Sequence, residues 1–220
     1  EGLTYGAVRT ASTPRRLAFW VDGLQAAQAD EDLVLTGPPA RIAFDADGKP
    51  TKAALGFAAK QGVDASALYK LETEKGEYLA ARVHKRGART AELLPGLLEE
   101  LIANIPFRKS MRWGTESQTF ARPVHWICAL YGGQTLPVRF ADVTSGNLTY
   151  GHRFHAPGPI EVTGAAQWAA ALFEASVEVN PETRRLTIRT QLAALAMEAG
   201  GVAVDDPELV AEVANLCESP

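Results

Sequence analysis

The chain has 220 residues, 46% hydrophobic and 22% charged, which is typical of a soluble globular protein with one large or two small domains. Its net charge of -4 argues against a wholly basic nucleic-acid coat but is compatible with a local basic face, because phosphate binding depends on clustered charge. The two cysteines, Cys128 and Cys217, form no disulfide framework, which favours a reducing cytoplasm.

No apolar run approaches the roughly 20 residues of a membrane span, and no signal peptide is present, so we expect a cytoplasmic protein without membrane contact. The chain begins at Glu1 without Met and stops inside an apolar helical pattern. We therefore expect it to be a fragment of a longer protein.

The amino-terminal residues predict two β-strands, 5–11 and 16–23, joined by a turn at residues 12–15. In the second strand one set of side chains is apolar and is expected to be buried: Leu17, Phe19 and Val21. The alternate set is mixed: Arg16, Ala18, Trp20 and Asp22. Arg15 and Arg16 at the turn are expected to be solvated charges, with a phosphate contact as the alternative.

Residues 25–50 are polar and rich in turn residues, which indicates loops around short strands. Thr51 and Asp64 each precede a short helical pattern, and Gly62 closes the first. A hairpin of strands 71–74 and 78–86 follows. A leucine- and isoleucine-rich stripe from residue 93 to 105 then predicts a helix that ends at Pro106.

Residues 124–131 are apolar on both alternating faces, which predicts a central strand covered on both sides, with Trp126 in the core. The preceding residues predict a shaped loop that carries Lys109, Arg112 and Arg122 among aromatic side chains. Cations between aromatic residues suit phosphates and stacked bases, but they also suit ordinary cation–π packing.

A return strand is expected at 134–140, followed by a glycine- and proline-rich loop that contains His152, Arg153 and His155. Further helices are expected from Thr163, Asn180 and Asp206, and a short strand at 202–204. The long helix after Asn180 should bury an apolar stripe: Ile188, Leu192, Leu195, Ala196 and Ala199. Its arginines should lie on the outer side: Arg184, Arg185 and Arg189.

These elements predict an α+β fold with mixed or antiparallel sheets and flanking helices. Two lobes are expected, an amino-terminal one at residues 1–106 and a second one at 107–220 that contains the central strand and the carboxy-terminal helices.

The sequence predicts no catalytic residue and no metal site. His152 and His155 could in principle join Cys128 or Cys217 around zinc, but no Cys-x-x-Cys pair exists and Cys128 lies in the apolar segment. Neither a phosphate-binding Gly-x-x-x-x-Gly-Lys-Ser/Thr loop nor a dinucleotide fingerprint is present.

Five motifs occur in an order that resembles one known family. They are Ala11-Ser-Thr-Pro-Arg-Arg-Leu-Ala18, Pro50-Thr-Lys-Ala-Ala54, Met111-Arg-Trp-Gly114, Phe120-Ala-Arg-Pro-Val-His-Trp126 and Gly151-His-Arg-Phe-His-Ala-Pro157. Together they resemble the beta subunit of the bacterial two-subunit glycyl-tRNA synthetase, over nearly the whole chain.

The resemblance implies a class II aminoacyl-tRNA synthetase, of which this chain would be an amino-terminal to middle segment of the beta subunit. In that family the alpha subunit holds the ATP and glycine site, where Mg is also expected, and beta engages the tRNA within an alpha2-beta2 heterotetramer. The family's beta chain continues into an HD-like region and an anticodon-binding domain, which are absent here. No cofactor is expected in this segment.

The function that the resemblance implies is a non-catalytic one: support of glycine-tRNA engagement and of assembly with the alpha subunit. The alternative is a structural spacer that touches no RNA. A hydrolase acting on mischarged tRNA would need a nucleophile or an activated water that the sequence does not supply.

We take as candidate tRNA-binding residues the basic side chains on the loops: Arg15, Arg16, Lys109, Arg112, Arg122, His152, Arg153 and His155. Arg112, Arg122 and Arg153 are predicted to share one basic surface. In the alternative, one or more of these arginines is buried and pairs with Asp142 or Glu116 to brace the loops.

Overall fold

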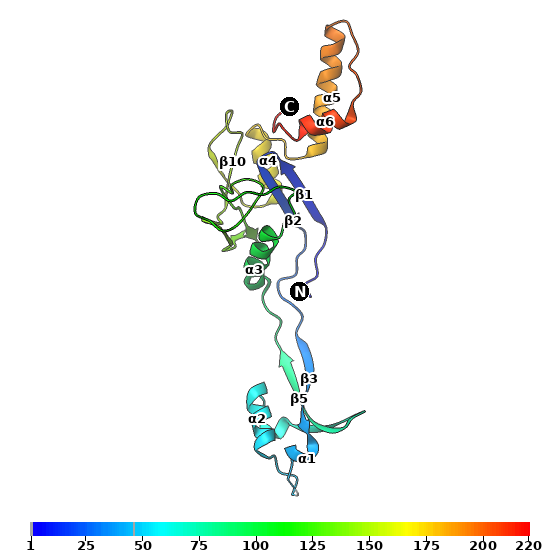
Figure 1. Ribbon diagram of the computed structural model, residues 1–220, viewed down its shortest axis with the longest axis vertical. Coiled ribbons are helices and arrows are strands. Elements are labelled where there is room, and N and C mark those ends of the chain that lie inside the picture. Colours follow the sequence, from blue (N-terminus) through cyan, green and yellow to red (C-terminus); the bar gives the residue numbers. More distant parts are fainter. Residues whose placement is uncertain (1, 46) are drawn as a thin grey trace. The chain divides into compact units, whose positions relative to one another are not determined.

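A computed structural model describes residues 2–45 and 47–220 and confirms the predicted α+β class (Figure 1). Every strand ladder in the described residues is antiparallel. The chain divides into two compact units, one formed by Ala26–Arg89 with the extreme amino terminus and one formed by Thr4–Gln25 and Thr90–Pro220. These boundaries differ from the lobes 1–106 and 107–220, because the amino-terminal hairpin packs with the carboxy-terminal part of the chain.

The unit around residues 26–89 is built on a three-stranded sheet in the order β3 (Glu31–Pro39), β5 (Gly76–Lys85), β4 (Tyr69–Thr73). Three short helices complete it: α1 (Ala40–Ala43), α2 (Lys52–Gln61) and the 3-10 helix η1 (Ala65–Ala67). Its core is small and consists mainly of Ala43, Ala54 and Leu79. The nine-residue β3 is longer than the short strands expected among loops in this region.

Of the three local signals in this unit, those at Gly62 and Asp64 are confirmed, whereas the Thr51 side chain makes no cap hydrogen bond. Gly62 ends α2 at a φ of 68°, a left-handed conformation that glycine adopts without a steric penalty. The Asp64 carboxylate accepts the Ser66 backbone N–H and so caps η1. Thr51 precedes α2 as expected, but its hydroxyl donates to the carbonyls of Ile42 and Ala43, so it joins α1 to α2.

In the second unit, the hairpin of β1 (Val8–Thr13) and β2 (Arg16–Val21) presents the opposite face to the core from the one predicted. Ala18 and Trp20 pack against the core cluster, whereas Leu17 and Phe19 are 60% and 47% exposed. The cluster itself comprises Ala11, Val162, Trp168, Leu172, Val177 and Val179. The alternation was therefore read correctly, but the assignment of its two faces was wrong.

The predicted central strand at 124–131 is also wrong as a strand. Only β6 (Leu130–Tyr131) and an isolated bridge from Cys128 to Gly146 have ladder hydrogen bonds. The segment is nevertheless covered on both sides: Cys128 and Leu130 pack on the cluster around Leu172. Ala129 belongs to a second cluster with Leu136 and Val138, against α3 (Thr90–Ala103). The segment is therefore buried on both sides because it lies between two small cores, although it is not part of a continuous sheet.

Gly132 and Gly133 join β6 to β7 (Gln134–Thr135), both with positive φ, as the hairpin requires. The return segment buries Leu136, Val138 and Phe140 as predicted. It is a strand only in pieces, as β7 and then β8 (Arg139–Phe140), which pairs with β9 (Val143–Thr144).

The rest of the unit runs through β10 (Leu148–Tyr150) and β11 (Pro159–Glu161) into three helices: α4 (Ala165–Glu174), α5 (Pro181–Glu198) and α6 (Pro207–Ala214). Asn180 and Asp206 cap α5 and α6 as predicted. The expected strand at 202–204 does not form. No helix in the described residues is both long and apolar enough to cross a membrane.

Candidate functional site

The turn of the amino-terminal hairpin holds a buried cation. Arg16 pairs with the Glu218 carboxylate and donates to the carbonyls of Tyr150 and Gly151, the latter at 3.0 Å. Glu218 also accepts the Thr13 hydroxyl at 2.7 Å. Burial lowers the pKa of Arg16, and the negative charge of Glu218 opposes that shift, so the guanidinium stays charged. Arg16 is therefore an internal connection between three segments, in contrast to the solvated charge expected.

Arg15, its neighbour, lies at the edge of the same group. Its guanidinium is 3.7 Å from Glu218 and lies 5.7 Å from the centre of the Trp126 ring. The guanidinium of Arg16 lies 5.6 Å from the same ring, and Tyr150 meets Trp126 edge-on at 5.1 Å. Trp126 is only half-buried, so it is a platform for cations rather than the core residue predicted.

The loop after β10 folds around His152. The His152 Nδ1 accepts the backbone N–H groups of Phe154 and His155, both at 3.3 Å, and its ring stacks on His155 at 4.4 Å. Partial burial, and then the positive charges of His155, Arg15 and Arg16, lower the pKa of His152. The lowered pKa disfavours the positively charged form of the ring, which is the form that would attract a phosphate.

A second buried arginine, Arg184 near the start of α5, was predicted on the outer side of the helix and is instead completely buried. It donates to the carbonyls of Ala214 at 2.8 Å, Ser12 at 2.9 Å and Glu178 at 2.7 Å. Ala214 ends α6, where a cation is favourable for the helix dipole. Arg184 therefore connects the hairpin, the segment before α5 and the end of α6.

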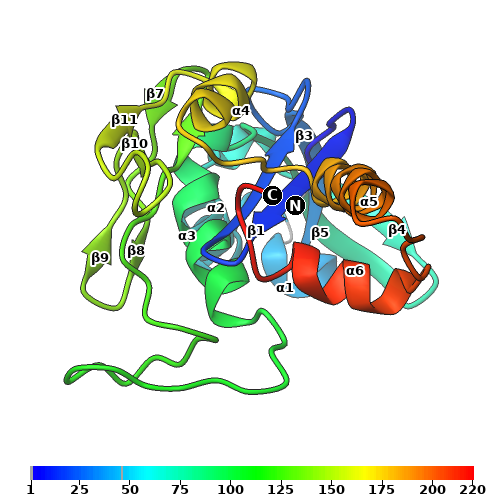
Figure 2. The same ribbon diagram turned by 90° about the horizontal axis from the view of Figure 1, so that it is seen from above.

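Three further candidate cations, Lys109, Arg112 and Arg122, lie on the segment between α3 and β6, seen in Figure 2 as the long green loop. Residues 107–123 carry four exposed basic side chains and one acid, Glu116. The four are Arg108, Lys109, Arg112 and Arg122. None forms an ion pair with any residue that the structure describes. In particular, no pairing of Arg112 or Arg122 with Glu116 or Asp142 is present among the described residues.

Aromatic side chains fix the base of this loop. Met111 and Phe120 form a two-hydrogen-bond bridge, with N–O distances of 2.8 and 3.1 Å. Phe120 packs edge-on against Phe107 at 4.7 Å and Phe140 at 5.8 Å, and Trp113 contacts Phe140 at 6.3 Å. These rings anchor the loop to β8 rather than standing free for bases. Lys109 and Arg122 each lie two residues outside this bridge, one on each limb of the loop.

The structure thus divides the predicted candidates into groups. Arg15, Arg16, His152 and His155 gather around Trp126 and Glu218. Lys109, Arg112 and Arg122 share the 107–123 loop. Arg153 is exposed beside His152, with its guanidinium 5.3 Å from the Phe154 ring. A tRNA contact of any of these residues stays a prediction.

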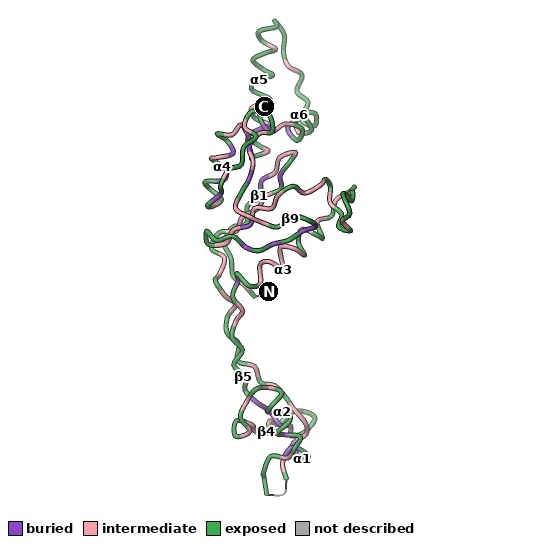
Figure 3. The backbone as a smooth tube through the Cα atoms, turned by 90° about the vertical axis from the view of Figure 1, so that its left-hand side faces the viewer, coloured by how far each residue is buried: buried purple, intermediate pink, exposed green. Residues whose placement is uncertain are grey.

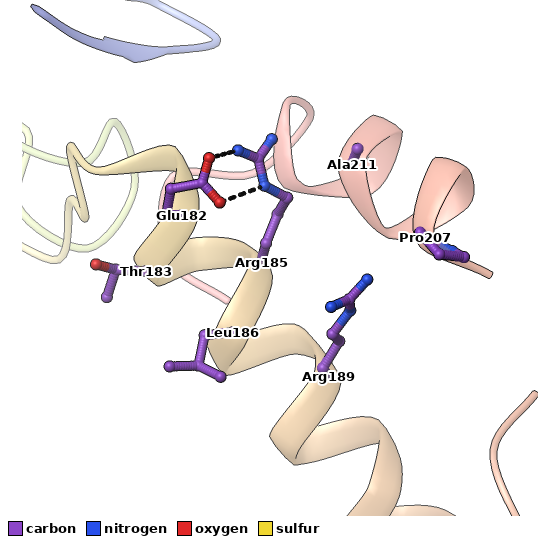
Figure 4. Close-up of a pocket in the computed structure, with 7 residues that line it drawn as sticks. All are labelled: Glu182, Thr183, Arg185, Leu186, Arg189, Pro207 and Ala211. Carbon is purple, nitrogen blue, oxygen red and sulfur yellow. Dashed lines mark hydrogen bonds and ion pairs between the residues drawn. The ribbon is translucent and has the colours of Figure 1, made fainter. Parts of the chain in front are cut away.

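An open groove of about 610 Å³ lies between α5 and the start of α6. Figure 4 shows Arg185 paired with Glu182 on its α5 side and Arg189 directed toward Pro207. It holds no catalytic arrangement: its lining has no histidine or cysteine. Among the residues that the structure describes, no group of three or more His, Cys, Asp or Glu side chains could hold a metal ion.

Sequence reasoning missed Arg184 and Glu218. Arg184 had a usable signal, because it lies four residues before Ile188 and so belongs to the apolar stripe of α5. Glu218 had none, since its partner is 202 residues away.

Comparison with known proteins gives consistent matches. The family model described as glycyl-tRNA synthetase beta subunit matches residues 1–220. The chain is 48% identical over 218 residues to the glycine–tRNA ligase beta subunit of Syntrophotalea carbinolica, a match that covers 99% of this chain and 32% of that protein. Identity is 45% over 218 residues to that of Geobacter metallireducens (99% and 32%) and 47% over 219 to that of Anaeromyxobacter dehalogenans (99% and 31%). The chain spans about a third of the length of these relatives.

Proposed function

The chain belongs to the glycyl-tRNA synthetase beta subunit family, and we propose that it is a non-catalytic part of a glycine–tRNA ligase that contacts tRNA. The resemblance found in the five sequence motifs and the family match agree over the whole chain. In this proposal, ATP-dependent attachment of glycine takes place on an alpha subunit, which also holds ATP and Mg. The beta segment helps to engage the tRNA and to assemble an alpha2-beta2 enzyme in the cytoplasm.

The observation that carries the tRNA contact is the charge of the 107–123 loop. The loop contains four exposed cations and only one acidic residue, and none of the four cations has an ion-pair partner among the described residues. Folded RNA is bound largely through its phosphates and its shape, so fixed cations on a projecting loop suit it. The whole chain has a net charge of -4, so this local excess of positive charge does not simply reflect a basic composition.

Arg112 and Arg122 are the residues we propose for phosphate contact, with Lys109 beside Arg122. Arg153 is proposed as a separate contact on the loop after β10. We leave Arg16 outside the proposed surface, because its guanidinium is already occupied by Glu218 and two carbonyls. His152 is left out because its lowered pKa disfavours the charged form. Arg15 and His155 are exposed and stay within the proposed surface.

The alternative, a structural spacer that touches no RNA, is favoured by one observation: the two buried arginines brace distant segments without reaching solvent. The two functions differ in what a loop substitution does. A tRNA filter-binding titration with the full alpha–beta enzyme tests this. Arg112→Ala with Arg122→Ala should weaken tRNA binding and its salt dependence, whereas the spacer function requires wild-type binding.

A further inference from the structure

Near its carboxy-terminal end, α5 carries a run of apolar residues that extends around the helix. Residues 192–197 read Leu-Ala-Ala-Leu-Ala-Met, six consecutive apolar residues, and six residues cover more than a full helical turn. Leu192, Leu195 and Met197 are 45%, 60% and 78% exposed. In Figure 3 most of this part of α5 is drawn as exposed. A helix that is apolar all round is normally found inside a protein core.

One side of this segment continues a stripe that is already buried. Ile188 packs against Val210 and Ala214 of α6, and Leu192 and Leu195 follow it four and seven positions later on the same face. The sequence predicted Leu192 and Leu195 to be buried, and within this chain they are not. The reason is length: α6 has 8 residues and covers only the first part of the 18-residue α5.

The opposite side is apolar as well. Leu186 and Met197 lie eleven positions apart, three helical turns, so they share a face away from Ile188, and both are exposed. The loop that follows α5 adds Val202 and Val204, both almost fully exposed. Contiguous exposed apolar residues on this scale mark a surface that another segment covers.

We infer that residues 186–204 are the centre of a helical core that a further segment of the same beta polypeptide completes. The relatives are about three times as long as the matched span, so such a polypeptide has the length to supply it. The all-round apolar character selects this occupant: a separate subunit docking on one face would leave the opposite face in water.

The groove beside residues 186–204 indicates which side chains the covering segment should carry. Pro207 and Ala211 of α6 line the groove, and the Arg189 guanidinium at its edge has no ion-pair partner among the described residues (Figure 4). On the groove side, the arriving part of the polypeptide is therefore expected to present aliphatic residues and an Asp or Glu at the rim that reaches Arg189. The opposite side, with Met197, requires a second element of the same polypeptide. The inference does not depend on any tRNA contact.

Methionine oxidation tests it without disturbing the fold. The chain has two methionines, Met197 and Met111, and Met111 on the 107–123 loop is the internal control. The full-length beta subunit, alone and with alpha, is treated with hydrogen peroxide, and each site is followed by peptide mass spectrometry relative to its rate in urea. We expect Met197 to be protected at least tenfold in beta alone, with Met111 close to its rate in urea. A Leu195→Met variant reports the other face and should be protected equally.

Other outcomes overturn the inference. Oxidation of Met197 at its rate in urea, both alone and with alpha, would show that nothing covers the helix. Protection that requires alpha would make alpha the occupant, and protection that disappears on dilution would make a second copy the occupant. Protection of only one of Met197 and the Leu195→Met site would mean that a single face is covered.

Discussion

Arg16 and Glu218 form a buried ion pair between the first hairpin of the chain and its last residues, 202 positions apart. Both side chains are almost completely excluded from solvent, and two backbone carbonyls complete the shell of Arg16. The pair therefore holds the turn end of the hairpin against the carboxy-terminal segment.

Glu218→Gln is expected to lower the free energy of unfolding of this chain by about 3–5 kcal/mol, because it leaves the buried Arg16 charge without its counter-ion. Urea denaturation measures it. The matched control is Glu212→Gln on the exposed side of α6, which should change stability by less than about 0.5 kcal/mol. Equal stabilities of the two variants would mean that the ion pair does not form.

Trp126→Ala should destabilise the chain by about 2 kcal/mol, less than the 3–5 kcal/mol typical of a fully buried aromatic residue. Trp126 is half-buried, and the variant loses the edge-on contact with Tyr150 and the contacts with Arg15 and Arg16. The measurement is again urea denaturation, with the exposed Phe154→Ala as the control. A loss as large as that of a core tryptophan would restore the central-strand interpretation.

Loss of a phosphate contact should appear in the salt dependence of tRNA binding. For Arg112→Ala or Arg153→Ala in the full alpha–beta enzyme, the slope of log K against log salt should fall by about 0.7–0.9 per contact, with thermal stability unchanged. Lys60→Ala on α2 is a control for net charge alone. A loss of stability with the same salt slope would instead identify a bracing arginine and contradict the tRNA surface.

The unit around residues 26–89 should be more stable in mild acid because of His84. Its Nδ1 lies 2.9 Å from Asp32 and its Nε2 3.3 Å from Asp30, which raises the pKa of His84, mainly through the hydrogen bond to Asp32. The folded state therefore holds the proton more tightly than the unfolded state. The added stability is fully present below the unfolded value of 6.5 and is lost as pH rises through the higher folded pKa.

NMR titration of the His84 ring checks this directly. Asp32→Asn should move the pKa of His84 down and flatten the pH dependence, while Glu31→Gln, on the neighbouring position of β3, should leave both nearly unchanged. His152 should respond with the opposite sign, because its pKa is lowered and protonation favours the unfolded state. A raised pKa at His152 would contradict the acceptor role of its Nδ1.

The elements that the sequence predicted well are those set by neighbouring residues. Asn180 and Asp206 cap their helices through side chains that reach N–H groups two or three positions away, and Gly62 needs only its own φ. The turn at Gly132 and Gly133 is of the same kind. Such signals lie within a few residues of the structure they determine.

The incorrect predictions concern features that depend on residues far away in the sequence. Alternation in β2 defines two faces, but the core around Leu172 selects the face with Ala18 and Trp20. The 124–131 segment has the composition of a buried strand, and no neighbouring strand of matching length pairs with it. The candidate site was predictable as a set of basic loop residues, whereas the burial of Arg16 depended on Glu218, which no local pattern indicates.

The unit around residues 26–89 interrupts the other unit at a single point. The chain leaves at Gln25 and returns at Thr90, whose hydroxyl donates to the Gln25 carbonyl, and Ala27 pairs with Arg89 on the far side of that junction. In genetic terms the interruption has the form of a cassette, and we expect its replacement by a few glycines to change one connection of the other unit. An exchange of residues 26–89 between homologous chains by recombination would then leave the rest of the reading frame to specify the same fold.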